Sequence, residues 1–278
     1  MSRTLLVPTD LSARSRPGVR FAAQLAEQAG YALVFFYNHS VLRPTRWSEK
    51  RYQEHLASEQ EKATRDLRYF IRNAYRNAPG SKPTIRFLVH LAPDAGKAIV
   101  DAAREIDADA ICMSSRGAGG LRKLLGSNAA YVIGHSPIPV FVLPQGYRRR
   151  PVRNIFYASD FNALGKELKF VRQFARLFEA RIIVYHYDPM ADVPEVRRKL
   201  QKAADKYRYA DVSFRIQKMQ IGKSLVVHIE RDMRSCSASL AVLFTDQNRS
   251  WFDKLFMSSN SVKAAYNTTV PLLIAPKR

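Results

Sequence analysis

A basic, glycine-rich segment is the part of the chain whose residue types are best suited to binding chemistry. Residues 114–128 read SSRGAGGLRKLLGSN. Its glycines let the backbone approach a ligand, and its cations add positive charge: Arg116, Arg122 and Lys123. Gly126 and Ser127 then open a predicted helix with Ser127 as its N-cap, and exposed amides at a helix N-terminus attract phosphate. The segment predicts a phosphate site, although ordinary turns also need glycine.

Motifs for catalysis are missing from the sequence. It contains no Gly-x4-Gly-Lys-Ser/Thr phosphate loop and no Gly-x-Ser-x-Gly nucleophile motif. No His-x-x-x-His or paired-cysteine spacing indicates zinc, and the six histidines are scattered. An enzyme is therefore the less favoured class.

The elements that must position these residues can be predicted from the hydrophobic pattern. In the first half we expect strands at 4–7, 32–37, 84–91, 110–113 and 139–143. Helices are expected between them, at 17–29, 48–78, 96–106 and 127–135. Strands that alternate with helices of this length indicate an α/β fold with a doubly wound parallel sheet. Ligands in such sheets bind beyond the carboxyl ends of the strands, which here indicates the loops after the first and fourth strands.

The second half of the chain repeats the first. RTLLVPTDLS (3–12) reappears as RNIFYASDFN (153–162), and RFAAQLAEQAGYALVFFYN (20–38) matches KFVRQFARLFEARIIVYHY (169–187). SPIPVFVLP (136–144) parallels TTVPLLIAP (268–276) in the same order. We therefore expect two tandem domains, residues 1–147 and 148–278, each with a five-stranded, mostly parallel sheet and helices on both faces.

Composition sets further limits on the class of protein. Hydrophobic residues make up 46% and charged residues 25% of the 278 residues, as in ordinary globular proteins. No apolar run could span a membrane and no signal-peptide pattern is present, so we expect a cytoplasmic protein with no membrane partner. The two cysteines are expected to be buried free thiols. The net charge of +21 favours nonspecific binding of polyanions, or simply keeps the surface well solvated.

The chain resembles the tandem form of the universal stress protein family over nearly its whole length. The resemblance rests on VPTDLS (7–12), ADAICMSSRGAGGLRKLLGS (108–127) and SPIPVFVLP. The nucleotide-binding branch of that family carries Gly-x2-Gly-x9-Gly-Ser/Thr. Here Ser114 replaces the first glycine, Gly117 matches the second, and Gly126-Ser127 closes the motif after eight residues.

By this resemblance the first domain binds ATP or a related adenine nucleotide, accompanied by Mg²⁺. The first-loop residues meet the nucleoside, and Asn38 falls where the family places an adenine contact. The alternative for Asp10 and Ser12 is to cap the following helix, and both roles can coexist. The predicted nucleotide-binding residues are Pro8, Thr9, Asp10, Asn38, Ser114, Arg116, Gly117, Gly119, Gly120, Gly126, Ser127 and Asn128.

The second domain departs from this pattern. Its equivalent loop is LFTDQNRSWFDKLFMSSNS (243–261), with Phe244 near the first glycine position and Ser258-Ser259 in place of Gly-Ser. No glycine follows Gly222. Aromatic side chains would fill a phosphate cradle there: Phe244, Trp251, Phe252 and Phe256. We expect a degenerate domain with a structural role.

The leading hypothesis is a non-catalytic stress-response or regulatory module whose nucleotide occupancy alters a surface offered to an unidentified protein partner. The alternative is a nucleotide-free scaffold that binds protein or nucleic acid through its basic surface, and a weak ATPase or phosphotransferase is a third candidate. The resemblance also implies that Pro139–Leu143 and Pro271–Ala275 pair across a pseudo-dimer of the two domains. Association of two chains into a homodimer stays open.

Overall fold

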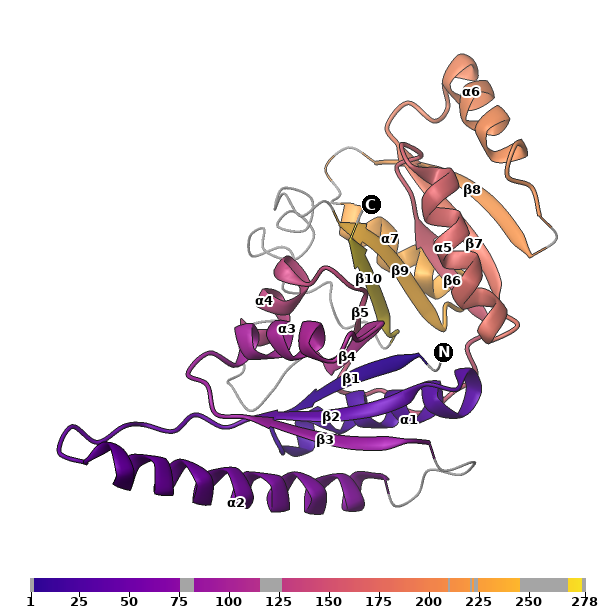
Figure 1. Ribbon diagram of the computed structural model, residues 1–278. Helices are drawn as coiled ribbons and strands as arrows, with labels where there is room; N and C mark the ends of the chain where they lie inside the picture. Colours follow the sequence, from indigo (N-terminus) through magenta and orange to yellow (C-terminus); the bar gives the residue numbers. More distant parts are fainter. Residues whose placement is uncertain are drawn as a thin grey trace. The chain divides into compact units, whose positions relative to one another are not determined.

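The computed structural model describes residues 3–75, 83–115, 127–209, 211–220, 222, 225–245 and 270–276 (Figure 1). The chain divides into two compact units, residues 1–149 and 150–278. Each unit contains five described strands, and we describe each unit by itself. Within the described residues, no helix has the length and apolar composition needed to cross a membrane.

The first unit alternates strands and helices along the chain, as the sequence predicts. Its described strands are β1 (Thr4–Thr9), β2 (Ala32–Asn38), β3 (Ile85–His90), β4 (Ala110–Ser114) and β5 (Val140–Leu143). Its described α-helices are α1 (Arg16–Ala29), α2 (Glu49–Tyr75), α3 (Ala95–Glu105) and α4 (Ser127–His135). All the strand pairs are parallel, in the order β3-β2-β1-β4-β5.

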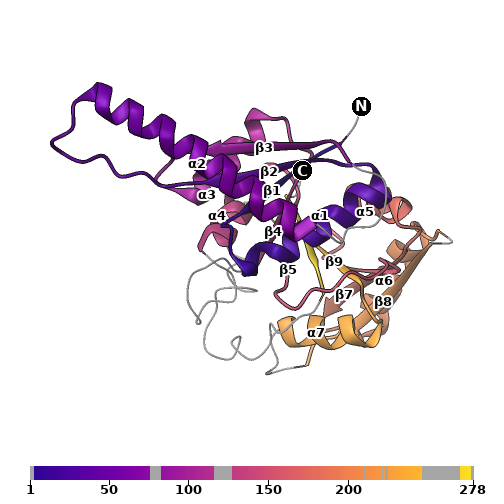
Figure 2. The same cartoon turned by 90° about the horizontal axis from the view of Figure 1, so that it is seen from below.

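Helices cover both faces of this sheet. Helix α1 packs against α2 and α3 packs against α4, and the two views show α2 and α3 on opposite faces (Figures 1 and 2). Strands β1, β2 and β4 are buried along most of their length because neither face meets solvent, which explains their continuous apolar runs. Helix α1 begins with Pro17 in its first turn and ends at Gly30, whose φ of 68° is left-handed and suits glycine.

The second unit repeats this arrangement. Its described strands are β6 (Asn154–Ala158), β7 (Arg181–Asp188), β8 (Val212–Lys218), β9 (Leu240–Thr245) and β10 (Leu272–Pro276). Its described helices are α5 (Leu164–Leu177), α6 (Pro194–Asp205) and α7 (Leu225–Ser235). The strands are again parallel, in the order β8-β7-β6-β9-β10, which is the order of the first unit. The predicted α/β fold class with parallel, doubly wound sheets is confirmed.

Candidate functional site

The strand order of the first unit reverses between β1 and β4, where ligands bind in sheets of this kind. Strand β1 pairs with β2 as far as Thr9, but the described pairing of β1 with β4 ends at Leu6 and Ile111. Pro8 lies on the carboxyl side of that point and has no amide to donate to a neighbouring strand. The described pairing of the two strands therefore ends before their last residues, Thr9 in β1 and Ser114 in β4.

The loop after β1 is held by its own side chains. Thr9 is buried, and its hydroxyl lies 2.7 Å from Ser15 Oγ and accepts the amide of Leu11 at 3.0 Å. Asp10 Oδ1 accepts the hydroxyl of Ser12 at 2.7 Å and its amide at 3.1 Å. Ser12 in turn caps the short 3-10 helix Ala13–Ser15 by accepting the amide of Arg14. Ser12 therefore caps this short helix, as predicted for the turn, whereas Asp10 holds Ser12 and α1 has Ser15 as its N-cap without a side-chain bond.

Asp10 is the exposed carboxylate at this edge of the sheet. The side chain of Asp10 is exposed, whereas Pro8 and Thr9 beside it are buried in β1. The Asp10 charge also affects Tyr37, near the end of the neighbouring strand β2. Burial raises the pKa of Tyr37, and the negative charges of Asp66, Asp10 and Glu59 raise it further. Asp10 can therefore meet a ligand from solvent while it holds Ser12.

Ser114, which stands in the first-glycine position, is built into the fold. Its hydroxyl accepts the amide of Gly18 at 3.0 Å and donates to the carbonyl of Ser15 at 3.1 Å. A Cβ on Gly18 would lie 3.2 Å from the backbone nitrogen of Ser114 and 3.3 Å from the backbone of Met113. Glycine at position 18 thus lets the start of α1 approach the end of β4. The Ser114 side chain is 6% exposed, so its contacts are with the protein.

Asn38 also uses its side chain within the fold. Its Nδ2 donates to the carbonyl of Ala92 at 2.8 Å, and its Oδ1 accepts the amide of Ala92 at 3.2 Å. This pair of bonds fastens the end of β2 to the loop after β3. A ligand contact at Asn38 would use the second hydrogen of its amide or the second lone pair of its oxygen.

The remaining predicted residues belong to the loop and helix after β4. Ser127 and Asn128 are exposed in the first turn of α4, so the predicted helix after Gly126 is present. No hydrogen bond joins them to the other predicted residues in the part of the chain that the structure describes. Five predicted residues lie outside the described residues: Arg116, Gly117, Gly119, Gly120 and Gly126.

In the second unit, large side chains occupy the equivalent positions. By strand register, Phe244 of β9 is the counterpart of Ser114 of β4. By the sequence repeat, Glu167 is the counterpart of Gly18. The Phe244 ring is 9% exposed and lies 5.7 Å, centroid to centroid, from the rings of Tyr157 and Phe170. Phe244 therefore fills the position as predicted. Trp251, Phe252, Phe256 and Ser258-Ser259 lie outside the described residues.

The two units also differ in a buried acidic side chain, Glu167, which stands at the position of Gly18. Glu167 is 4% exposed and accepts a hydrogen bond from the hydroxyl of Tyr157, which also lies 3.0 Å from Ser159 Oγ. Burial and the Glu167 charge raise the pKa of Tyr157. His186 Nδ1 lies 2.9 Å from the carbonyl oxygen of Ser159. The close approach that Gly18 permits in the first unit is thus replaced by a hydrogen-bonded cluster.

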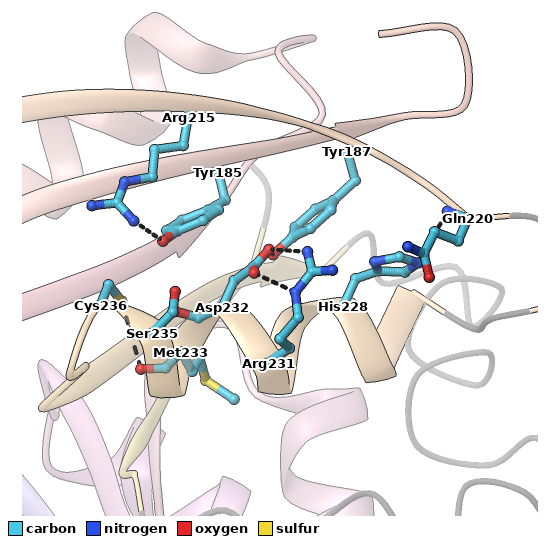
Figure 3. A network of polar contacts seen from close by, with 10 residues as sticks. All are labelled: Tyr185, Tyr187, Arg215, Gln220, His228, Arg231, Asp232, Met233, Ser235 and Cys236. Atoms are coloured by element: carbon cyan, nitrogen blue, oxygen red, sulfur yellow. Dashed lines mark hydrogen bonds and ion pairs between the residues drawn. The ribbon is translucent and has the colours of Figure 1, made fainter. Parts of the chain in front are cut away.

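Sequence reasoning missed a polar network between strands β7 and β8 and helix α7 of the second unit (Figure 3). Tyr187 of β7 donates to Asp232 of α7 at 3.0 Å, and Arg231 binds both oxygens of Asp232 at 2.8 and 3.1 Å. Arg215 of β8 donates to the hydroxyl of Tyr185 at 2.9 Å. Nearby, His228 accepts the amide of Gln220 at 3.2 Å.

The signal for this network lies in the repeat itself. Helices α3 and α7 have the same length, and each ends five residues before the next strand begins. Aligned in this way, three apolar positions of α3 become ionisable in α7, where all three are again buried: Ala98 to His228, Val100 to Glu230 and Ala102 to Asp232. The two units therefore share a backbone pattern and differ in the polarity of their interiors.

Neither unit shows a metal centre in its described part. No group of three or more histidine, cysteine, aspartate or glutamate side chains there could hold a metal ion. Both cysteines are free and buried, as predicted. Burial raises the pKa of the Cys112 and Cys236 thiols, so neither is an activated nucleophile.

Comparison with known proteins agrees with this architecture. A sequence model of the universal stress protein family matches residues 1–144. A universal stress protein from Archaeoglobus fulgidus DSM 4304 has a similar solved structure, with a TM-score of 0.69, 17% identity and full coverage of both chains. A functionally unknown protein from Pseudomonas aeruginosa PAO1 has a TM-score of 0.62 and 13% identity, over 99% of this chain and 92% of that one. Comparison with curated protein sequences found no significant match.

Proposed function

This chain belongs to the universal stress protein family, and from that premise we propose that its first unit binds ATP or a related adenine nucleotide at the β1–β4 switch point. The bound nucleotide acts as a regulatory signal and is not turned over efficiently. The observation that carries this proposal is the exposed Asp10 carboxylate, held by Ser12 beyond the described pairing of β1 with β4.

Each predicted contact has a physical role in this proposal. Asp10 accepts hydrogen bonds from the ribose or the base, since its carboxylate is exposed at the end of β1 and carboxylate oxygens are acceptors. The amides at the start of α4, next to Ser127, favour the phosphates. Gly126 and the other glycines of the loop let its backbone approach them, with Mg²⁺ as the accompanying ion. Thr9 and Ser114 position the loops through bonds within the protein.

We assign no nucleotide to the second unit. Phe244, Tyr157 and Glu167 pack together in the second unit, where the first unit has the close approach of Gly18 to Ser114. Asp160 remains after β6, and its Oδ1 accepts the amide of Asn162 as Asp10 accepts that of Ser12. The two units therefore differ at Phe244 and Glu167 and not at this carboxylate. The second unit then contributes structure and a surface for an unidentified protein partner.

Calorimetric titration of Mg-ATP into the full chain at moderate salt tests this proposal. We expect saturable binding of one ATP per chain, weakened at least tenfold by Asp10→Ala and abolished by Gly126→Val. The matched control is Asp160→Ala, the counterpart of Asp10 in the second unit, which should leave affinity unchanged. Absence of binding, or binding that ignores Asp10→Ala and fades with salt, would contradict the proposal.

A further inference from the structure

Helix α2 is longer than its sheet requires. It runs from Glu49 to Tyr75, but its described buried residues, Ala63, Leu67 and Ile71, all lie in its second half. No residue from 39 to 62 is buried. Figure 1 shows the preceding loop and the first half of α2 extending beyond the ends of β2 and β3. Core packing therefore does not explain this half of the helix.

The solvent side of α2 carries a basic and aromatic stripe, which we call the α2 face. It consists of residues separated by 11, 3, 4 and 3 positions, a spacing that keeps them on one side of a helix. All are exposed, on the side away from the buried stripe: Arg51, Lys62, Arg65, Tyr69 and Arg72. Tyr69 is 71% exposed, which is unusual for so large a ring on a helix with a packed opposite side.

At the N-terminal end of this face, an aromatic ring lies against Arg51. The Arg51 guanidinium lies 4.7 Å from the centre of the Trp47 ring. A second pair, Arg43 at 5.0 Å from the centre of the Tyr52 ring, lies on another side of the helix. The Trp47 and His55 rings lie nearly perpendicular to each other, with their centres 5.1 Å apart. Aromatic rings and cations are therefore close together in a segment that has no buried residue.

Two exposed acidic side chains of α2, Glu54 and Glu61, share this side of the helix and only partly offset its charge. Glu61 pairs with Arg65 at 3.8 Å, and Glu49 pairs with Arg43 at 2.8 Å. All four side chains are more than half exposed, and such surface ion pairs are weak and easily exchanged for another anion. The whole chain carries a net charge of +21, which adds a long-range attraction for polyanions.

We propose that the α2 face binds single-stranded nucleic acid. Proteins that bind single strands combine cations along the phosphate backbone with aromatic rings on which unpaired bases stack. The α2 face supplies both, with Arg51, Lys62, Arg65 and Arg72 for phosphates and the exposed Tyr69 ring for a base. An acidic protein would use the cations alone, and a duplex offers few unstacked bases, so neither accounts for Tyr69. This binding is separate from the nucleotide site at Asp10.

Fluorescence anisotropy with a dye-labelled 20-nucleotide oligo(dT) or oligo(U) tests the proposal on the full chain. The double variant Lys62→Glu/Arg65→Glu should weaken binding about tenfold or more. The matched control is Arg198→Glu/Lys199→Glu on the exposed side of α6, which makes the same change in net charge and should cost less than about threefold.

Tyr69 distinguishes stacking from simple charge attraction. Tyr69→Ala should weaken binding about fivefold or more without changing its dependence on salt, and Tyr69→Phe should retain binding. Because Tyr69 is exposed, circular dichroism should show no loss of helix in either variant. Equal weakening by the α6 control would overturn the proposal, as would an unchanged affinity in Tyr69→Ala. Competition by polyglutamate or a 20-base-pair duplex as strong as that by the unlabelled single strand would also overturn it.

Discussion

The hydroxyl of Ser114 accepts the backbone amide of Gly18 at 3.0 Å, although 96 residues separate the two in the chain. This bond joins the end of β4 to the first turn of α1, beside the switch point of the sheet. It satisfies one of the amides that a helix leaves unpaired at its N-terminus. The residue in the first-glycine position of the family motif therefore has a structural task in this protein.

Ser114→Ala should lower the free energy of unfolding by about 1–2 kcal/mol, because it leaves the buried Gly18 amide without its acceptor. Urea denaturation followed by circular dichroism measures this change. Ser115→Ala is the control: Ser115 is only half-buried and its amide, not its side chain, bonds to Leu143. An equal loss of unfolding free energy in both variants would show that the hydrogen bond from Gly18 to Ser114 does not stabilise the protein.

Gly18→Ala should destabilise the first unit by about 1–3 kcal/mol, since the new Cβ would press on backbone atoms that cannot rotate away. Gly134 in α4 has no heavy atom within 4 Å of an added Cβ. Gly134→Ala should therefore raise stability by about 0.4–1 kcal/mol. Thermal unfolding of the two variants should shift in opposite directions, and a shift in the same direction would contradict the close approach of α1 and β4.

Phe244→Ala should cost about 3 kcal/mol, because it opens a cavity between the rings of Tyr157 and Phe170. The loss should appear in the unfolding of the second unit, and ATP affinity of the folded protein should stay unchanged. Val227→Ala, at a 40% exposed position of α7, serves as the control and should change stability by less than about 0.5 kcal/mol. A gain of a second ATP in Phe244→Ala would show that Phe244 alone blocks the site.

Glu230 should make stability depend on pH. Burial raises the pKa of its carboxyl to about 7, and no described hydrogen bond reaches its Oε1. An unfolded glutamate has a pKa of about 4.3, so the folded protein binds the additional proton between these values. The stabilising contribution is complete below about pH 4 and is lost as pH rises through about 7.

Glu230→Gln should therefore raise stability at pH 8 by roughly 1–3 kcal/mol and change it little at pH 4. Denaturant titrations at several pH values measure this difference. Glu54→Gln, an exposed carboxyl on α2, should leave the pH profile as it is. A Glu230→Gln profile parallel to that of the natural sequence would mean that this carboxyl titrates normally.

Secondary structure was predictable because its signals are local. The apolar run at 32–37 gives β2, and the capped, amphipathic pattern at 17–29 gives α1. Helix α4 begins at Ser127, where the sequence predicts it. The alternation of these elements fixes parallel strands and so the switch point after β1. Asp10 could be identified because it follows directly from that strand end.

The tasks of individual side chains were less predictable. The sequence places Ser114 in a nucleotide motif, while the structure shows its hydroxyl bound to Gly18 and Ser15. Asn38 likewise bonds to Ala92, 54 residues away. Hydrogen bonds over such separations depend on which strands become neighbours, and hydrophobic periodicity carries no information about them.

The sequence by itself determined the repeated α/β pattern, the order of elements and the contrast between a glycine-containing and an aromatic loop. Each of these depends on a local preference: apolar periodicity, capping residues or the absence of a Cβ. Only the tertiary structure decided that the Tyr157 hydroxyl bonds to Glu167 and that the Tyr157 ring packs against Phe244. It also decided that α7 buries three ionisable side chains, His228, Glu230 and Asp232, and that the first half of α2 has no buried residue. Burial is a property of the assembled sheet and its helices, because it depends on what lies on the other side of each residue.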